Sequence, residues 1–311
     1  MNTHQYRQKL DRAGLDHVLA ESLVDPGMIR DWAELTEASY NTAYRIRLTD
    51  GTGLVLKVAP DPDAPGLTYE HGLMRTEAEF YQAAQGKVPV PEVVYSSGSE
   101  FLLMTELPGN NWFGQRDSIT DTDRLRTELG GHVAALHRIT GPGFGYPQNP
   151  LQPTWRAAFT AMMADILADA ERYEVPLPID GIRAAIHANE ALLDAVDTPV
   201  LVHFDLWDGN ILVHDGRISG LVDGERAFWG DPVAEFVSLA LFRDIEEDHA
   251  FFEGYGPVEF TGDVRRRLAM YRSYLYLIMI VEGTPRGYQG ADHDHIMDLT
   301  RRLLDIQLAR L

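Results

Sequence analysis

The chain has 311 residues, of which 45% are hydrophobic and 24% are charged, and it contains no cysteine. This length and apolar content suit a globular protein with a sizeable core, while the lack of cysteine excludes disulfides and thiolate metal sites. The formal net charge of −20 argues against nucleic-acid binding, because phosphate backbones require clustered Lys and Arg, but it would attract a cationic small molecule.

The first segment predicts a packing helix rather than a targeting signal. From His4 to Leu23, apolar residues recur at helical spacing. The opening residues MNTHQYRQKLDRAG lack the apolar core of a secretion signal. The longest apolar run, Leu275 to Val281, is too short to cross a bilayer. We therefore expect a cytoplasmic protein with no membrane partner.

Strand patterns come next along the chain. Trp32 to Leu48 predicts two strands joined by a loop, and Leu54 to Val58 predicts a third strand of high β propensity. Because side chains alternate across a strand, Lys57 shares a face with Val55 rather than with the leucines beside it. A lysine in such a strand more often faces solvent than serves a functional site.

A helix is expected from about Tyr69 to Gln85, after a polar loop. Glu77 lies one turn before Tyr81 on this helix, while Glu79 points elsewhere. An unpaired position at the surface is the ordinary expectation for both glutamates.

The following elements indicate a boundary between two lobes. The prolines of VPVPEVVYSS end the helix and begin an edge strand, and Phe101 to Thr105 predicts a buried strand. That strand runs into Glu106-Leu107-Pro108-Gly109, and the chain beyond is almost entirely helical in pattern. Because a Pro-Gly pair at such a junction suits a hinge, we predict an N-lobe of residues 1–107 and a C-lobe of residues 108–311.

The second half contains several amphipathic patterns that predict helices. The clearest of them cover Trp155 to Tyr173, Ile182 to Val196 and Leu268 to Val281. Asp165, Asp169 and Glu171 on the first of these helices could meet a cation, but a solvated helix face is the commoner reason for such acids.

The segment from Leu201 to Asp231 contains the strongest functional pattern. Ile211 to His214 and Ile218 to Val222 predict two short strands that form a hairpin through the three residues between them, Asp215 to Arg217, and this hairpin follows the turn-rich stretch DLWDGN. The hairpin returns the chain to its start, so Asp223 should lie beside Asn210, with Asp205 close by. Such hard oxygen ligands suit Mg²⁺, which completes its shell with water and phosphate oxygens. Taken alone, DLWDGN would also suit an ordinary loop.

Two of these motifs resemble those of a known family. HFDLWDGNILV and LVDGERAFWGDP are similar to the aminoglycoside phosphotransferase patterns H-G-D-x-x-x-x-N and I-D-W-E-x-A-x-x-G-D-P. Leu206 and Trp207 after the first Asp also resemble the fructosamine kinase branch. The resemblance implies an α+β, two-lobed protein-kinase-like fold, with an antiparallel five-stranded N-lobe sheet and a mainly helical C-lobe.

The resemblance also implies roles for matching residues of the second half. Asp205 would be the catalytic residue that accepts the proton of the substrate hydroxyl. Asn210 and Asp223 would hold Mg²⁺ against the nucleotide phosphates.

In the first half, the resemblance implies a nucleotide site. Lys57 would pair with the α and β phosphates of ATP, and Glu77 would be the ion-pair partner of this lysine, with Glu79 as the alternative. The adenine pocket would involve Met104, Glu106 and Leu107.

The loop over the phosphates departs from the family pattern L-S-G-G-x-x-N-x-x-Y. Ser39, Asn41 and Tyr44 match this pattern, and Ser39 would help to cover the phosphates. Glu37 and Ala38 stand where the family has glycines. The departure removes the residues best able to expose backbone N–H groups to a phosphate.

Three functions are compatible with this sequence. The first is an ATP-dependent or GTP-dependent O-phosphotransferase acting on a hydroxyl of an aminoglycoside or another antibiotic. The second is a metabolic kinase for a sugar, ketosamine or amino alcohol. The third is a nucleotide-binding module without catalysis, which the missing glycines keep open. We predict phosphoryl transfer to a small molecule, whose identity no motif specifies.

Overall fold

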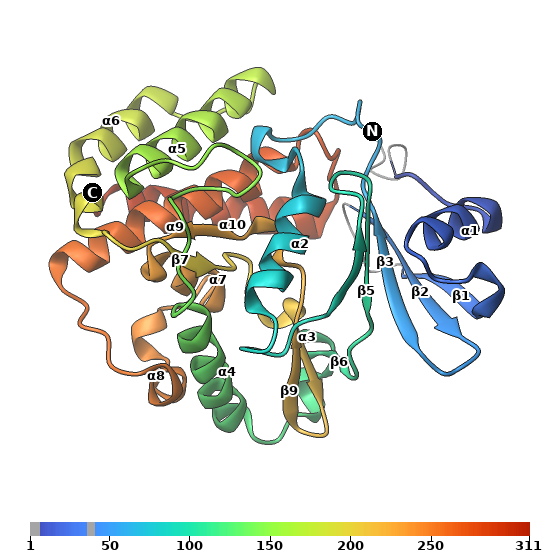
Figure 1. Cartoon of the computed structure of the whole chain (residues 1–311). Helices are drawn as coiled ribbons and strands as arrows, with labels where there is room; N and C mark the ends of the chain where they lie inside the picture. Colours follow the sequence, from blue (N-terminus) through green and yellow to red (C-terminus); the bar gives the residue numbers. More distant parts are fainter. Residues whose placement is uncertain (1–6, 36–40) are drawn as a thin grey trace.

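The computed structural model describes residues 7–35 and 41–311 and has two lobes (Figure 1). The N-lobe is built on one antiparallel sheet with the strand order β1-β2-β3-β5-β4. Its strands are β1 (Ile29–Leu35), β2 (Thr42–Leu48), β3 (Gly53–Val58), β4 (Val93–Ser96) and β5 (Phe101–Thr105). The predicted five-stranded sheet is therefore confirmed, and β4 is the edge strand that its prolines indicated.

The two faces of this sheet have different partners. The apolar residues of β3 pack against α1 (Arg12–Glu21), which covers the outer face. Lys57 of β3 and its cross-strand partner Leu102 lie on the opposite face, toward α2 (Leu73–Ala84). Strand alternation thus directs the lysine toward the second lobe. The helix predicted from His4 begins at Arg12 among the described residues.

The C-lobe is mainly helical, as predicted. Its α-helices are α3 (Trp112–Gln115), α4 (Thr122–Leu136), α5 (Trp155–Arg172), α6 (Ile179–Asn189), α7 (Phe236–Leu239), α8 (His249–Tyr255), α9 (Gly262–Glu282) and α10 (Ala291–Leu308). Its strands are β6 (Asn110–Asn111), β7 (Val200–Val202), β8 (Ile211–His214), β9 (Arg217–Leu221) and β10 (Phe228–Gly230). The helix expected up to Val196 ends at Asn189, and a 3-10 helix continues the chain to Ala195.

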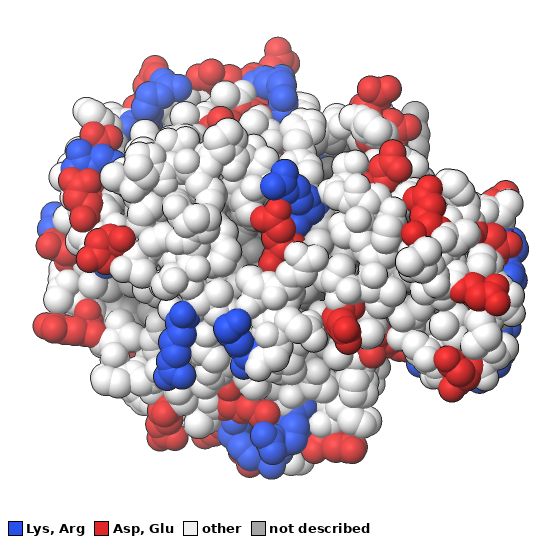
Figure 2. All heavy atoms as spheres, in the orientation of Figure 1, with Lys and Arg blue, Asp and Glu red and all other residues white. Residues whose placement is uncertain are grey.

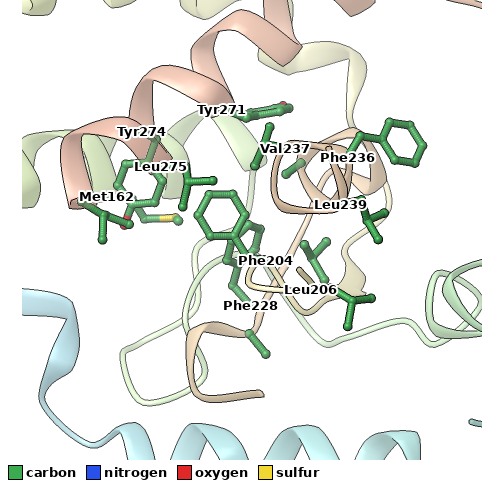
Figure 3. Packing of buried hydrophobic residues seen from close by; sticks show 14 of the residues in the cluster. Met162, Phe204, Leu206, Phe228, Phe236, Val237, Leu239, Tyr271, Tyr274 and Leu275 are labelled. Atoms are coloured by element: carbon green, nitrogen blue, oxygen red, sulfur yellow. The ribbon is translucent and has the colours of Figure 1, made fainter. Parts of the chain in front are cut away.

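The core of the C-lobe anchors the loop between β7 and β8. Phe204 and Leu206, on either side of Asp205, are both at most 1% exposed. Figure 3 shows these two side chains among apolar residues of α7 and α9. The ring of Phe204 lies 5.0 Å from that of Phe228 and 5.7 Å from that of Tyr274. Burial of the flanking residues therefore fixes the backbone from which Asp205 projects.

Asp169 corrects one expectation from the sequence. This residue of α5 is 2% exposed, so it is not part of a solvated helix face. Its carboxylate accepts hydrogen bonds from the backbone N–H of Thr68 at 2.6 Å and from the hydroxyl of Thr68 at 2.7 Å. A buried carboxylate needs such donors. Asp169 therefore joins α5 to the N-lobe segment that precedes α2.

Charged groups are spread rather than gathered on the face of the molecule that Figure 2 shows. On the face in Figure 2, basic side chains are interspersed with acidic ones, and no basic stripe crosses the described residues there. Among the helices described, none combines the length and the apolar character needed to span a membrane.

Candidate active site

A two-residue turn sets the geometry of the metal-type residues. His214 pairs with Arg217 across the turn, and Asp215 and Gly216 between them have φ values of 48° and 69°. Positive φ at both positions matches a type I′ turn, which suits the twist of a hairpin. At the open end, the N–H of Val222 donates to the backbone oxygen of Asn210 at 3.0 Å. The hairpin thus brings Asn210 and Asp223 together.

Lys57 joins the two lobes at this point. Its Nζ donates to Oε1 and Oε2 of Glu77 at 2.7 and 2.8 Å, and it also donates to Oδ1 of Asp223. Glu79, the alternative partner, instead pairs with Arg75 on the exposed side of α2 at 2.7 Å. The structure therefore places Glu77, and not Glu79, beside the lysine.

Neighbouring charges set the protonation states of Lys57 and Asp223. Burial alone would lower the pKa of Lys57, but Asp223 and Glu77 together raise it well above its ordinary value. Burial would likewise raise the pKa of Asp223, but the ammonium group of Lys57 holds it below its usual value. Lys57 and Asp223 therefore face each other in their charged forms across the lobe interface.

Asp205 lies in a strained and tightly bonded loop. Phe204, just before it, has a φ of 65°, which is unusual for a residue with a side chain and is typical of functional loops. The fully buried carboxylate of Glu235 accepts hydrogen bonds from the N–H groups of His203 at 2.7 Å and Phe204 at 3.0 Å. These bonds hold the strained backbone in place.

The side chain of Asp205 meets an amide and a guanidinium group. Asn210 donates from Nδ2 to the backbone oxygen of Asp205 at 2.8 Å and to its Oδ2 at 3.3 Å. Nη1 of Arg226 lies 4.0 Å from Oδ1 of Asp205. Burial raises the pKa of Asp205 to about 6, against the opposing charge of Arg226. Such a carboxylate can accept a proton near neutral pH.

The donor set around Asp223 suits a hard divalent cation. Because Asn210 bonds Asp205 through its nitrogen, its amide oxygen is left to face a cation, and Asp223 adds carboxylate oxygen. Oxygens of Glu77, Asp223 and Glu225 lie within 4.8 Å of one another. Asn210 and Asp223 fit Mg²⁺, which needs only one or two protein groups beside water and phosphate oxygens.

The predicted adenine contacts lie where β5 leaves the sheet. Met104 is 3% exposed and pairs with Val55 in the sheet. The carboxylate of Glu106 pairs with Arg45 and Arg47 of β2. The backbone N–H of Glu106 donates to the backbone oxygen of Gly53 at 2.9 Å. Because that N–H is occupied, an adenine would have to use other backbone groups near Leu107. Ser39, the predicted phosphate contact, lies outside the described residues.

Comparison with known proteins identifies the family. A sequence profile of the phosphotransferase enzyme family (APH) matches residues 31–271, well over half of the chain. The chain belongs to the phosphotransferase enzyme family. It is thus a small-molecule phosphotransferase, as the two motifs around Asp205 and Asp223 indicated.

Individual relatives of this phosphotransferase agree with that assignment. Hygromycin-B 4-O-kinase of Escherichia coli is 26% identical over 271 residues, which cover 78% of this chain and 72% of the relative. A proposed fructosamine-3-kinase from Thermobifida fusca YX-ER1 superposes with a TM-score of 0.69 at 23% identity, covering 95% of this chain and 99% of the other.

A third relative was solved with ligands. A thermostable mutant of aminoglycoside phosphotransferase APH(4)-Ia, in a ternary complex with AMP-PNP and hygromycin B, superposes with a TM-score of 0.67 at 21% identity. The alignment covers 95% of this chain and 98% of that one. At these identities, the two solved structures establish the kinase-like fold and nothing finer.

The structure of this phosphotransferase adds residues that the motif analysis missed. Tyr81 donates to Oε1 of Glu77 at 2.6 Å and accepts from the backbone N–H of Asp223 at 2.9 Å, so it joins the carboxylate of Glu77 to the backbone of Asp223. Its position one turn after Glu77 was a usable signal. Arg226 had no comparable signal, because its partner Glu282, at 2.9 Å, lies 56 residues along the chain.

Proposed function

We propose that the chain is an ATP-dependent O-phosphotransferase that moves the γ-phosphoryl group to a hydroxyl of a small molecule. One observation supports this most strongly. Lys57 and Glu77 of the N-lobe meet Asp223 of the C-lobe. Asn210 bonds Asp205 through its side chain, and its backbone oxygen accepts from the N–H of Val222, the residue before Asp223. Phosphoryl transfer passes through a loose transition state, so such positioned charges account for most of the catalysis.

Each residue of the group has a proposed task. Asp205 orients the acceptor hydroxyl and accepts its proton as the oxygen attacks phosphorus. Lys57, held by Glu77, binds the α and β phosphates of the nucleotide. Asn210 and Asp223 would hold Mg²⁺, which when bound neutralises charge on the phosphate oxygens. The adenine would lie beside Met104, close to a lobe boundary near residue 108.

For the acceptor, we favour an aminoglycoside or a related antibiotic. The similarity to hygromycin-B 4-O-kinase supports this choice, and the net charge of −20 would draw in a cationic molecule. A ketosamine or sugar is the second candidate, supported by Leu206 and Trp207, the pair that resembles the fructosamine kinase branch.

The test of the proposal is Asp205→Asn. The amide keeps the shape of the side chain but cannot accept the proton, so turnover should fall by about 10² to 10⁴-fold. ATP affinity should stay nearly unchanged, because Asp205 does not contact the nucleotide in this proposal. ADP release and equilibrium ATP binding are measured side by side.

A matched control makes the same chemical change elsewhere. Asp215→Asn alters an exposed turn residue at the far end of the hairpin, where Asn tolerates the positive φ. Its turnover should equal that of the original chain. Equal turnover in Asp205→Asn would remove Asp205 from the catalytic role.

The acceptor class is tested by measuring ADP release with a panel. The panel contains hygromycin B, other aminoglycosides, a ketosamine, simple sugars and choline-like alcohols. Release that requires an aminoglycoside supports the first candidate, and release that requires the ketosamine or a sugar supports the second. ATP binding without release for any acceptor would contradict the proposed catalysis.

A further inference from the structure

One polar contact between the lobes has no part in the proposed mechanism. Nδ2 of Asn41 donates to Oε2 of Glu225 at 2.7 Å, across 184 residues of sequence. Asn41 is 5% exposed and Glu225 is 8% exposed, so water does not compete freely for this bond. A buried hydrogen bond to a carboxylate is worth more than an exposed one, because either group left unpaired would be costly.

The contact joins two segments that flank the nucleotide site. Asn41 immediately precedes β2, in which Ala43 pairs with Lys57 of β3. Glu225 is the middle residue of a 3-10 helix that starts just after Asp223. A tie between them fixes the start of β2 relative to the Asp223 segment.

The charges around Glu225 explain why its partner is an amide. Glu225 is the third carboxylate of the group with Glu77 and Asp223, and the ammonium of Lys57 already binds the other two. Asn41 gives Glu225 a hydrogen bond without withdrawing Lys57 from the phosphate site. Oδ1 of Asn41 is buried and has no partner within the described residues, so Nδ2 alone holds this side chain.

We propose that Asn41 and Glu225 form a positioning tie that fixes β2, and through it Lys57 of β3, against the Asp223 segment, so that Lys57 and Asp223 stay aligned at the β and γ phosphates. The inference rests on the proposed function.

The first test compares two nucleotides by equilibrium binding. Asn41→Ala should weaken ATP binding by about tenfold, the size expected for the loss of one buried hydrogen bond. AMP has no β or γ phosphate, so its affinity should not change. Asn149→Ala, which removes an exposed amide, is the control and should bind both nucleotides as the original chain does.

The second test approaches the tie from the C-lobe. Glu225→Gln keeps an oxygen that can accept from Asn41 and should keep most of the ATP affinity, whereas Glu225→Ala should lose it. If the two residues act through one bond, Asn41→Ala combined with Glu225→Ala should bind ATP no more weakly than Glu225→Ala alone. Should Asn41→Ala fail to fold, the ATP affinities of Glu225→Gln and Glu225→Ala still test the tie. Equal affinities in these two variants would contradict it.

Several outcomes would overturn the tie. One is an equal loss of ATP and AMP affinity in Asn41→Ala, and another is unchanged binding of both. Additive losses in the double variant would also contradict it. Binding needs no acceptor, so these outcomes are separate from failure of the proposed function. If the original chain does not bind ATP at all, both proposals fail together.

Discussion

At the scale of single residues, the proton affinity of Asp205 is set by opposing influences. Burial raises its pKa to about 6, Arg226 opposes that rise, and the nearby charge of Asp223 adds to it. A base must be ionised to accept a proton. We therefore expect kcat/KM to be level above pH 7 and to fall by about tenfold per pH unit well below pH 6.

Arg226 provides the variants that test this assignment. Arg226→Gln removes the opposing positive charge, so the midpoint of the acid limb should move above pH 6. Arg226→Lys keeps a positive charge and should leave the midpoint near its original value. The measurement is kcat/KM for the acceptor at saturating ATP across pH 5 to 8. An acid limb with the same midpoint in both variants would mean that it does not report Asp205.

At the scale of elements, α4 and α8 approach each other through glycine. A Cβ atom at Gly130 would lie 2.1 Å from the backbone oxygen of Phe251, and one at Gly254 would lie 1.8 Å from that of Thr127. Backbone atoms cannot move aside as a flexible side chain can. On its other side, α4 holds the hairpin through Glu128, which pairs with Arg217 at 3.0 Å.

Gly130→Ala should therefore destabilise the protein by about 3 kcal/mol, the upper part of the range for overpacked cores. Gly131→Ala is the matched control, since its added Cβ would meet nothing within 4 Å. Because Ala favours a helix more than Gly does, this variant should stabilise by roughly 0.5–1 kcal/mol. Urea unfolding measures both values. Similar values for the two variants would refute the close approach of the helices.

The same scale shows what could be predicted from the sequence. The order of strands and helices followed from periodicity, and the meeting of Asn210 with Asp223 followed from the predicted hairpin. Its turn has two residues rather than the predicted three, because Arg217 pairs with His214. The alternation of side chains along the strand predicted which of its neighbours share a face with Lys57. Asp169 could not be assigned correctly, because its burial depends on Thr68, which lies 101 residues earlier. Long polar side chains are placed by such distant partners, which local patterns do not reveal.

At the scale of the whole molecule, buried polar contacts join the two lobes beside α2. Lys57 with Asp223, Asn41 with Glu225, and Thr68 with Asp169 are three of them. A fourth joins Glu70, just before α2, to Arg286, just after α9. Arg286 also pairs with Glu282 at 3.1 Å, and Glu282 pairs with Arg226 at 2.9 Å. A chain of alternating charges thus runs from the N-lobe to the side chain beside Asp205.

Arg286→Met tests how strongly this chain holds the lobes together. The change leaves Glu70, whose side chain is 1% exposed, without its cation, although one oxygen still accepts from the N–H of Leu67 at 2.7 Å. Removing one partner of a buried ion pair typically costs about 3–5 kcal/mol. We therefore expect a loss of that size in urea unfolding.

Two further variants decide what causes the loss. Arg266→Met breaks an exposed ion pair, in which the side chain of Arg266 is 46% exposed and that of Asp263 is 61% exposed. This change should lower the free energy of unfolding by at most about 1 kcal/mol. Adding Glu70→Gln to Arg286→Met removes the stranded charge and should restore part of the stability. If Arg286→Met costs no more than Arg266→Met, the buried chain contributes little. If Glu70→Gln restores nothing, the loss comes from packing rather than from an unpaired carboxylate.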